Sequence, residues 1–150
     1  MATDIHKADF LGKGWQFPPQ FSKETATVII TENETDINNS LQVLLTTAIT
    51  ERIMQPRYGC DARKWIFESM DTGTQTLMRD TIETAILYYE PRIEVLGLDF
   101  SAEKITEGLI AIIIEYKIKA TNSRFNFVFP YYLHEGSEIN FNTQHQPVLL

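Results

Sequence analysis

The proline at position 91 divides the sequence into two parts with different periodicities. Before Pro91, apolar residues recur at intervals of three and four, as on one face of a helix; after it they alternate, as in a strand. A proline lacks a backbone donor and disfavours α geometry in the preceding residue, so a helix should end at about Tyr89 and a strand should begin near Ile93. The sequence therefore predicts an α+β fold, with helices first and strands second.

Three helices are predicted before Pro91. The first begins at 31–36, where N-cap residues and first-turn acids gather, and runs to about Ile53. The second spans about 61–70 and the third about 74–89. The apolar stripes of the first and third helices are expected in the core, and they consist of Ile37, Leu41, Leu44, Leu45, Ala48, Ile49 and Ile53, and of Leu77, Met78, Ile82, Ala85, Ile86 and Tyr89.

Three strands are predicted after Pro91, at 93–100, 109–120 and 125–130. The second is the longest and is expected to be central, with one buried face formed by Ile110, Ile112, Ile114, Tyr116 and Ile118. The apolar parity of the first strand switches around Gly97, which indicates either a bulge or a strand covered on both faces. The fold is thus expected to be three N-terminal helices packed on a C-terminal three-stranded antiparallel β-meander.

The two ends of the chain show no helix or strand period. Residues 1–25 combine glycines, prolines and aromatic side chains and are expected to form an extended arm, whose aromatics are buried by the parent domain or by a partner. Residues 134–150 are polar and are expected to form a mobile tail. The domain itself is expected to span residues 26–133.

Charge and composition exclude several classes of protein. A net charge of −7 opposes binding to nucleic acid, whose recognition relies on clustered Lys and Arg. No apolar run reaches the length of a membrane span, and the N-terminus lacks the pattern of a secretory signal, so no membrane insertion and a cytoplasmic location are expected. Protein partners are therefore favoured.

No arrangement of residues predicts catalysis. Cys60 is the single cysteine, the histidines lack metal-ligand spacing, and no nucleophile motif occurs. A glycosidase needs two facing carboxylates, for which Glu90, Glu94 and Asp99 are candidates, but no motif places a second acid. We therefore expect no catalytic residue, metal or cofactor, and keep a small acidic cell-wall glycosidase as the alternative function.

An arginine lies between two carboxylates at the junction of helix and strand. Glu90, Arg92 and Glu94 fall on one face of the strand that begins there. A carboxylate at a helix C-terminus meets the negative end of the helix dipole, so Glu90 needs a compensating cation, and Arg92 is the nearest. The pair either forms an intramolecular salt bridge or docks a partner. In the docking interpretation, Arg92→Ala leaves the melting temperature nearly unchanged.

Four motifs, in order along residues 10–133, resemble the lysozyme-like baseplate wedge family. Its members are the small baseplate subunits, or sheath initiators, of contractile phage tails, type VI secretion systems and related extracellular injection particles. The motifs are Phe10-Leu11-Gly12-Lys13-Gly14-Trp15 with Phe17-Pro18-Pro19, then Glu51-Arg52 with Pro56-x-Tyr58-Gly59, then Glu90-Pro91-Arg92-Ile93, and last Asn126-Phe127-Val128-Phe129-Pro130-Tyr131-Tyr132-Leu133.

The resemblance implies a structural role rather than the lysozyme activity that the family name records. It implies a fold like the inner domain of sheath subunits, and several copies around a baseplate ring within the cytoplasm or an assembled phage-like particle. It also implies docking on larger wedge subunits. The residues implied in that docking are Glu90, Pro91 and Arg92, with Glu51, Arg52, Pro56, Tyr58 and Gly59 nearby.

The last predicted strand is expected to lie at an edge of the sheet. Pro130 removes a ladder donor, and Phe125, Phe127 and Phe129 alternate where charges usually guard an exposed edge. Such an edge can accept a strand from another chain, and the resemblance implies that a sheath subunit supplies it. The alternative is that the N-terminal arm or the C-terminal tail of the same chain covers this edge.

Overall fold

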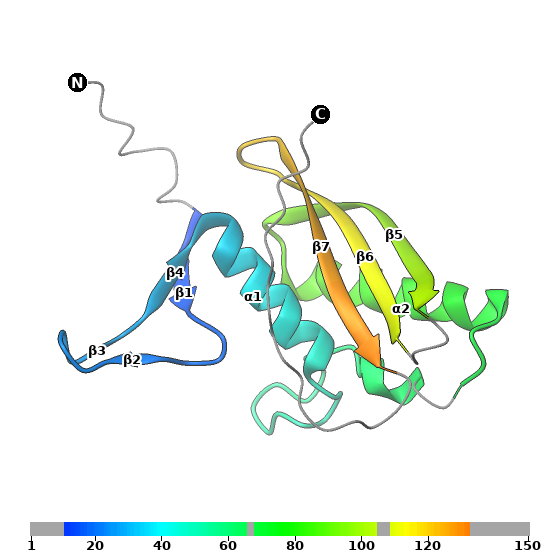
Figure 1. Cartoon of the computed structure of the whole chain (residues 1–150), viewed down its shortest axis with the longest axis horizontal. Helices are drawn as coiled ribbons and strands as arrows, with labels where there is room; N and C mark the ends of the chain where they lie inside the picture. Colours follow the sequence, from blue (N-terminus) through cyan, green and yellow to red (C-terminus); the bar gives the residue numbers. More distant parts are fainter. Residues whose placement is uncertain (1–10, 66–67, 105–108, 133–150) are drawn as a thin grey trace.

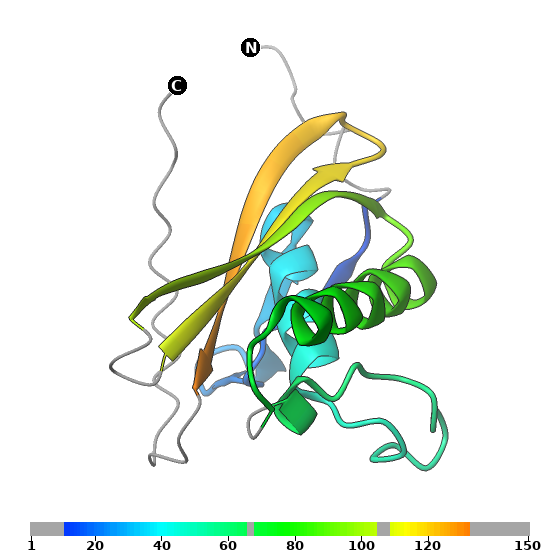
Figure 2. The same ribbon diagram turned by 90° about the vertical axis from the view of Figure 1, so that its right-hand side faces the viewer.

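A three-stranded sheet with two helices on one face forms the body of the protein (Figure 1 and Figure 2). The computed structural model describes residues 11–65, 68–104 and 109–132. Its elements are β1 (Lys13–Trp15), β2 (Phe21–Ser22), β3 (Thr27–Val28), β4 (Ile30–Glu32), α1 (Asn33–Thr46), a 3₁₀ helix (Ala62–Trp65), α2 (Thr72–Tyr89), β5 (Ile93–Lys104), β6 (Leu109–Ile118) and β7 (Ser123–Tyr132).

The main sheet is the antiparallel meander that the sequence predicts. Its order is β5-β6-β7, so β6 is central, and Ile118 pairs with both Ile93 and Ser123. The register of β5 against β6 shifts between Val95 and Gly97, which confirms the predicted bulge. Within the described part of the chain, β7 has no second neighbouring strand, so it lies at an edge as predicted.

The core lies between the sheet and the two helices. The predicted inner face of β6 is buried along its whole length, and the neighbouring side chains of the strand are less covered. Tyr116 on this face is fully buried, and its hydroxyl donates to Asn38 Oδ1 of α1 at 2.8 Å, which satisfies the polar end of the ring. The helix residues that close the core include Ile37, Leu41, Leu44 and Leu45 of α1, and Met78, Ile82 and Ile86 of α2.

The first of the three predicted helices is present, but its predicted end is wrong. The helix α1 ends at Thr46 and not near Ile53. The hydroxyls of Thr46 and Thr47 bond back to carbonyls of the preceding turn, and the backbone turns extended at Thr47. Such side-chain bonds compete with the continuation of a helix. As a result Ile49 is exposed, and Ile53 is 93% exposed, although both were expected in the core.

The second predicted helix is also wrong. In the described residues the segment 61–70 contains only the 3₁₀ turn Ala62–Trp65. Asp61, at the start of this segment, adopts a left-handed backbone conformation with φ of 52°, which is not helical. One short turn suffices to bury Trp65, so a longer helix is not needed to close the core. Two α-helices, rather than three, therefore cover the described sheet.

Two small antiparallel sheets occupy a region where the sequence analysis predicted no strand. β1 pairs with β4 and β2 pairs with β3, and together they form one long hairpin, residues 13–32, that projects away from α1 (Figure 1). Backbone bonds from Gln16 to Ile29 and from Ile29 to Gln20 join the two pairs. Part of the predicted extended arm is thus a hairpin, and the fold has three separate sheets among the described residues.

The predicted division into arm, domain and tail remains a prediction. The tail at 134–150 and the first ten residues lie outside the described residues. None of the described helices combines the length and apolar character needed to cross a membrane.

Candidate functional site at the junction of α2 and β5

The junction of α2 and β5 holds a cluster of charged side chains around Arg92. The helix ends at Tyr89, where the N–H of Glu90 bonds to the Ile86 carbonyl, and Pro91 prevents a further turn. Arg92 then donates to both carboxylate oxygens of Glu90, from Nε at 2.5 Å and from Nη2 at 2.7 Å. This fork-to-fork pair is the strongest geometry for an arginine and a carboxylate.

Arg92 also joins the cluster to two distant segments. Its Nη1 donates to Asp36 Oδ2 in the first turn of α1 at 2.7 Å, and to the main-chain oxygen of Leu11 at 2.8 Å. We call Leu11, Asp36, Glu90 and Arg92 the Arg92 cluster. Four of the five N–H groups of the guanidinium have partners in it, so the cluster ties the base of the hairpin and both helices to the start of β5.

The side chains of the Arg92 cluster are largely buried, so their contacts affect the stability of the fold. Glu90 is 3% exposed and Asp36 is 8% exposed, while about a quarter of the Arg92 side chain reaches solvent. The bonds to Glu90, and then those to Asp36, raise the pKa of Arg92 above its usual value, although its own burial acts in the opposite direction. Two carboxylates share one guanidinium, so the cluster keeps one uncompensated negative charge.

The structure therefore contains the intramolecular salt bridge that was one of the two interpretations of Glu90 and Arg92. Docking of a partner by these residues remains a prediction. The sequence analysis missed Leu11 and Asp36 as members of the cluster. Asp36 had been read only as a first-turn acid, and its separation from Arg92 by 56 positions leaves no local signal of their contact.

The loop between α1 and the 3₁₀ helix carries the other predicted docking residues. Glu51 accepts a bond from the Ala48 N–H at 2.8 Å, and the Arg52 guanidinium lies 4.2 Å from the centre of the Tyr58 ring. Tyr58 packs edge-on against Tyr89 with ring centres 5.0 Å apart. These contacts tie Glu51 and Arg52 to their own loop, while Tyr58 brings that loop against the end of α2.

Tyr58 lies between the loop and the Arg92 cluster. Burial raises the pKa of Tyr58, the charge of Glu90 raises it further, and the charge of Arg52 lowers it. Gly59 follows with φ of 114°, a conformation that favours glycine, and the Pro56 carbonyl accepts a bond from Thr50 at 2.7 Å. The loop is thus held in shape by its own backbone and by the packing of Tyr58.

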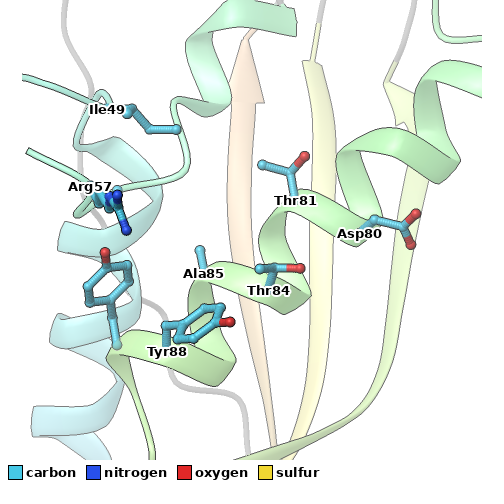
Figure 3. A pocket seen from close by; sticks show the side chains of 9 residues that line it. Ile49, Arg57, Asp80, Thr81, Thr84, Ala85 and Tyr88 are labelled. Atoms are coloured by element: carbon cyan, nitrogen blue, oxygen red, sulfur yellow. The ribbon is translucent and has the colours of Figure 1, made fainter.

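A shallow pocket of about 420 Å³ lies between this loop and α2. Figure 3 shows Thr84 and Tyr88 on the α2 side, with Ile49 and Arg57 across from them. Arg57 is exposed and has no hydrogen bond or ion pair within the described residues. Large exposed apolar side chains lie on the same two elements, and they are Ile49, Ile53, Met54, Leu77, Leu87 and Tyr88.

The three carboxylates considered for catalysis are all ion-paired. Glu90 is bound by Arg92, Glu94 Oε2 lies 2.8 Å from the Lys117 ammonium, and Asp99 lies 3.7 Å from Arg79. The bond to Lys117 lowers the pKa of Glu94, whereas a general acid needs a raised one.

Neither a reactive thiol nor a metal site is evident. Cys60 is buried, and desolvation raises its pKa to about 12, so it is a neutral packing residue. No group of potential metal ligands occurs among the residues that the structure describes.

The third group of predicted site residues lies on β7. Phe127 and Phe129 are buried against the helices and Phe125 packs beside Tyr116, so all three point into the core. Their side chains are not at the surface, and what β7 offers to another chain is its outer backbone edge.

Similarity to solved structures identifies the class of protein to which this chain belongs. A solved structure titled as the baseplate of the anti-feeding prophage has a TM-score of 0.62 and 29% identity to this chain, and the match covers 87% of this chain and 92% of that one. A second, titled as a putative tail lysozyme from Geobacter sulfurreducens, has a TM-score of 0.65 and 37% identity, with 74% and 100% covered. The fold is that of a contractile-tail baseplate component.

Comparison of the amino-acid sequence with protein families identifies the family of this chain. The family model described as baseplate wedge protein gp25 matches residues 31–123, more than half of the chain. The chain belongs to this family, which confirms the resemblance found in the sequence. Baseplate wedge protein gp25 of Enterobacteria phage T4 is 38% identical over 63 residues, 42% of this chain. That alignment spans about half the length of the T4 protein.

Proposed function

We propose that this protein is a non-catalytic baseplate subunit that docks on larger wedge subunits and starts assembly of the sheath, in several copies around the baseplate ring. Membership of the gp25 family and likeness to a baseplate structure support the baseplate role. The observation that carries the sheath role is that no strand among the described residues pairs with the outer edge of β7.

The proposed docking surface surrounds the Arg92 cluster. It consists of Glu90, Pro91 and Arg92 at the junction, with Glu51, Arg52, Pro56, Tyr58 and Gly59 in the neighbouring loop. Because Glu90 and Arg92 are bonded to each other, they act chiefly by holding Pro91 and the end of α2 in place. The exposed apolar side chains and the unpaired Arg57 beside them supply the contact area that an interface core requires.

Substitutions that leave the Arg92 cluster intact test this docking. Arg52→Ala and Arg57→Ala are expected to weaken binding of the larger wedge subunits, because a desolvated interface arginine can contribute about 2 kcal/mol, or about thirtyfold in affinity. Both side chains are exposed, so the free energy of unfolding should change little. Arg79→Ala on α2 is the matched control. Wedge co-purification equal to wild type in both variants would disprove docking at this surface.

The outer edge of β7 has free backbone groups at alternate residues. Proline is tolerated in a sheet where its nitrogen faces away from the neighbouring strand, so Pro130, opposite Ala111 of β6, marks the outward positions. Residues of the same parity, Asn126 and Val128, therefore turn their amides outward. Val128 is 56% exposed, and no described part of the N-terminal arm pairs with this edge.

A proline substitution on β7 can test strand addition if it removes an outward amide. Phe127 is not suitable, because its amide faces β6. Val128→Pro removes one outward donor and spares the pairing with β6, so the protein should fold and join baseplates. We expect sheath nucleation on those baseplates to fall at least about tenfold, because the added ladder loses one of its few outward donors. Val128→Ala keeps the amide and is the control. Nucleation at the normal rate on Val128→Pro baseplates would exclude strand addition here.

A cell-wall glycosidase is the less favoured function. It draws support from the solved structure titled as a putative tail lysozyme. The ion pairs of Glu90, Glu94 and Asp99 oppose it, because each of these carboxylates lies beside a cation of this chain, and a glycosidase needs two carboxyl groups that face each other across a cleft.

A further inference from the structure

A second groove, of about 300 Å³, lies between the hairpin and α1, away from the exposed face of α2. One wall is a helical stripe of α1 at positions 36, 39, 40 and 43, and the other is the start of the hairpin. Tyr58 closes one end. The groove is lined by Gly14, Trp15, Gln16, Phe17, Pro19, Asp36, Asn39, Ser40, Val43 and Tyr58.

The groove carries one negative charge and no positive one. Asp36 is its only ionisable acid or base apart from the Tyr58 phenol. Asp36 Oδ2 binds Arg92, whereas the single partner of Oδ1 within the described residues is the Thr31 hydroxyl, at 3.5 Å. Since Glu90 already takes two donors of Arg92, the single guanidinium does not neutralise both carboxylates. A cation in the groove would meet this uncompensated charge.

Aromatic rings and neutral acceptors complete the lining. Trp15 is 65% exposed, and Phe17 and Tyr58 lie on the same groove. Asn39 donates its amide to Thr31 at 3.2 Å, which leaves its side-chain carbonyl as an acceptor, and Ser40 adds a hydroxyl. Arg52 already lies over the Tyr58 ring at 4.2 Å, so this chain itself uses a guanidinium on one wall residue.

We infer that this groove binds an arginine side chain presented by a partner protein. A guanidinium is flat enough to lie against aromatic rings and has five donors in a fixed fork for the acceptors of α1. An ammonium group is a compact, strongly hydrated charge and matches the groove less well. The groove shares Tyr58 with the proposed docking surface for wedge subunits, but Trp15 and Ser40 lie outside that surface, so variants at these two positions test the groove alone.

Titration with N-acetylarginine amide, followed through the backbone amide NMR signals of Gly14, Trp15 and Ser40, tests the inference directly. N-acetylcitrulline amide is the control, because it keeps the shape and loses the charge. We expect saturable shifts with a dissociation constant on the order of millimolar for the arginine compound only. Equal shifts with both compounds, or none with either, would refute the inference.

Three variants test where the compound binds. Trp15→Ala should weaken it about fivefold through loss of the cation–π contact, whereas Phe21→Ala removes an exposed aromatic of the same hairpin outside the groove and should not change it. Ser40→Lys should place a tethered cation in the groove and compete with the compound. Equal weakening by Trp15→Ala and Phe21→Ala would place the compound elsewhere.

Lys7 is another cation of the same chain, and it precedes the hairpin in the sequence. If Lys7 filled the groove, the wild-type protein would reject the arginine compound and only Lys7→Ala would bind it. That result would replace the partner by an intramolecular contact. Equal binding by wild type and Lys7→Ala is the result that we expect.

Discussion

Arg92→Ala is expected to lower the free energy of unfolding by about 3 kcal/mol. The substitution leaves the buried carboxylate of Glu90 without its two donors and Asp36 without its charged partner, and removal of one member of a buried ion pair typically costs about 3 to 5 kcal/mol. We use the lower figure because part of Arg92 reaches solvent. Denaturant unfolding with an unchanged slope measures the difference.

Two further variants show whether the loss of stability comes from the bonds of the Arg92 cluster. Arg79→Ala breaks an exposed ion pair to Asp99 at 3.7 Å and should cost under about 0.5 kcal/mol. Arg92→Lys keeps the charge and loses the fork, so its cost should fall between the two. If Arg92→Ala unfolds no more readily than Arg79→Ala, the cluster does not stabilise the fold. The melting temperature that the docking interpretation left unchanged is thus expected to fall.

Gly59→Ala is expected to lower the free energy of unfolding by about 3 kcal/mol as well. A methyl group at this position would overlap the main-chain oxygen of Thr47, and a backbone atom at a helix end cannot move aside cheaply. The φ of 114° adds strain of about 1 to 3 kcal/mol for any residue with a side chain. The measurement is again unfolding by denaturant, followed by tryptophan fluorescence, to which the buried Trp65 contributes.

Gly73→Ala is the matched control for that prediction. Gly73 lies in the first turn of α2, where a methyl group meets only the Asp71 carboxylate at 3.6 Å, an ordinary contact. Alanine has the higher helix propensity, by up to about 1 kcal/mol, so this variant should be as stable as wild type or slightly more so. Equal losses in both variants would mean that Gly59 has no special backbone role.

Local chemistry in the sequence was enough to predict the second half of the fold. Pro91 fixed the end of α2, and strict alternation from Ile110 to Ile118 gave the buried face of the central strand. The parity change at Gly97 and the missing donor of Pro130 located the bulge and the edge strand. Each of these signals acts within a few residues, which is why a single sequence contains them.

The first half depended on side-chain hydrogen bonds and on contacts between distant residues, neither of which the apolar period reveals. The apolar period continues past Thr46, but the helix ends there because side-chain hydroxyls take its last carbonyls. The hairpin strands have two or three residues each, too few for an alternation to be seen, and Lys13 pairs with Glu32. The pairing of Arg92 with Glu90, its near neighbour, was correctly predicted. The bonds of Arg92 to Leu11 and Asp36 could not be predicted, because no pattern in the neighbouring sequence indicates them.

Pro130 would also limit how many residues of an incoming strand can pair with β7. The outward positions of β7 before it are Arg124, Asn126 and Val128, and at Pro130 only a carbonyl is left to pair. A ladder started near the hairpin turn therefore runs out of donors after three alternate residues. A slip by one residue would turn every side chain of the added strand to the opposite face. If a strand is added at this edge, Pro130 would therefore limit the length of the paired ladder.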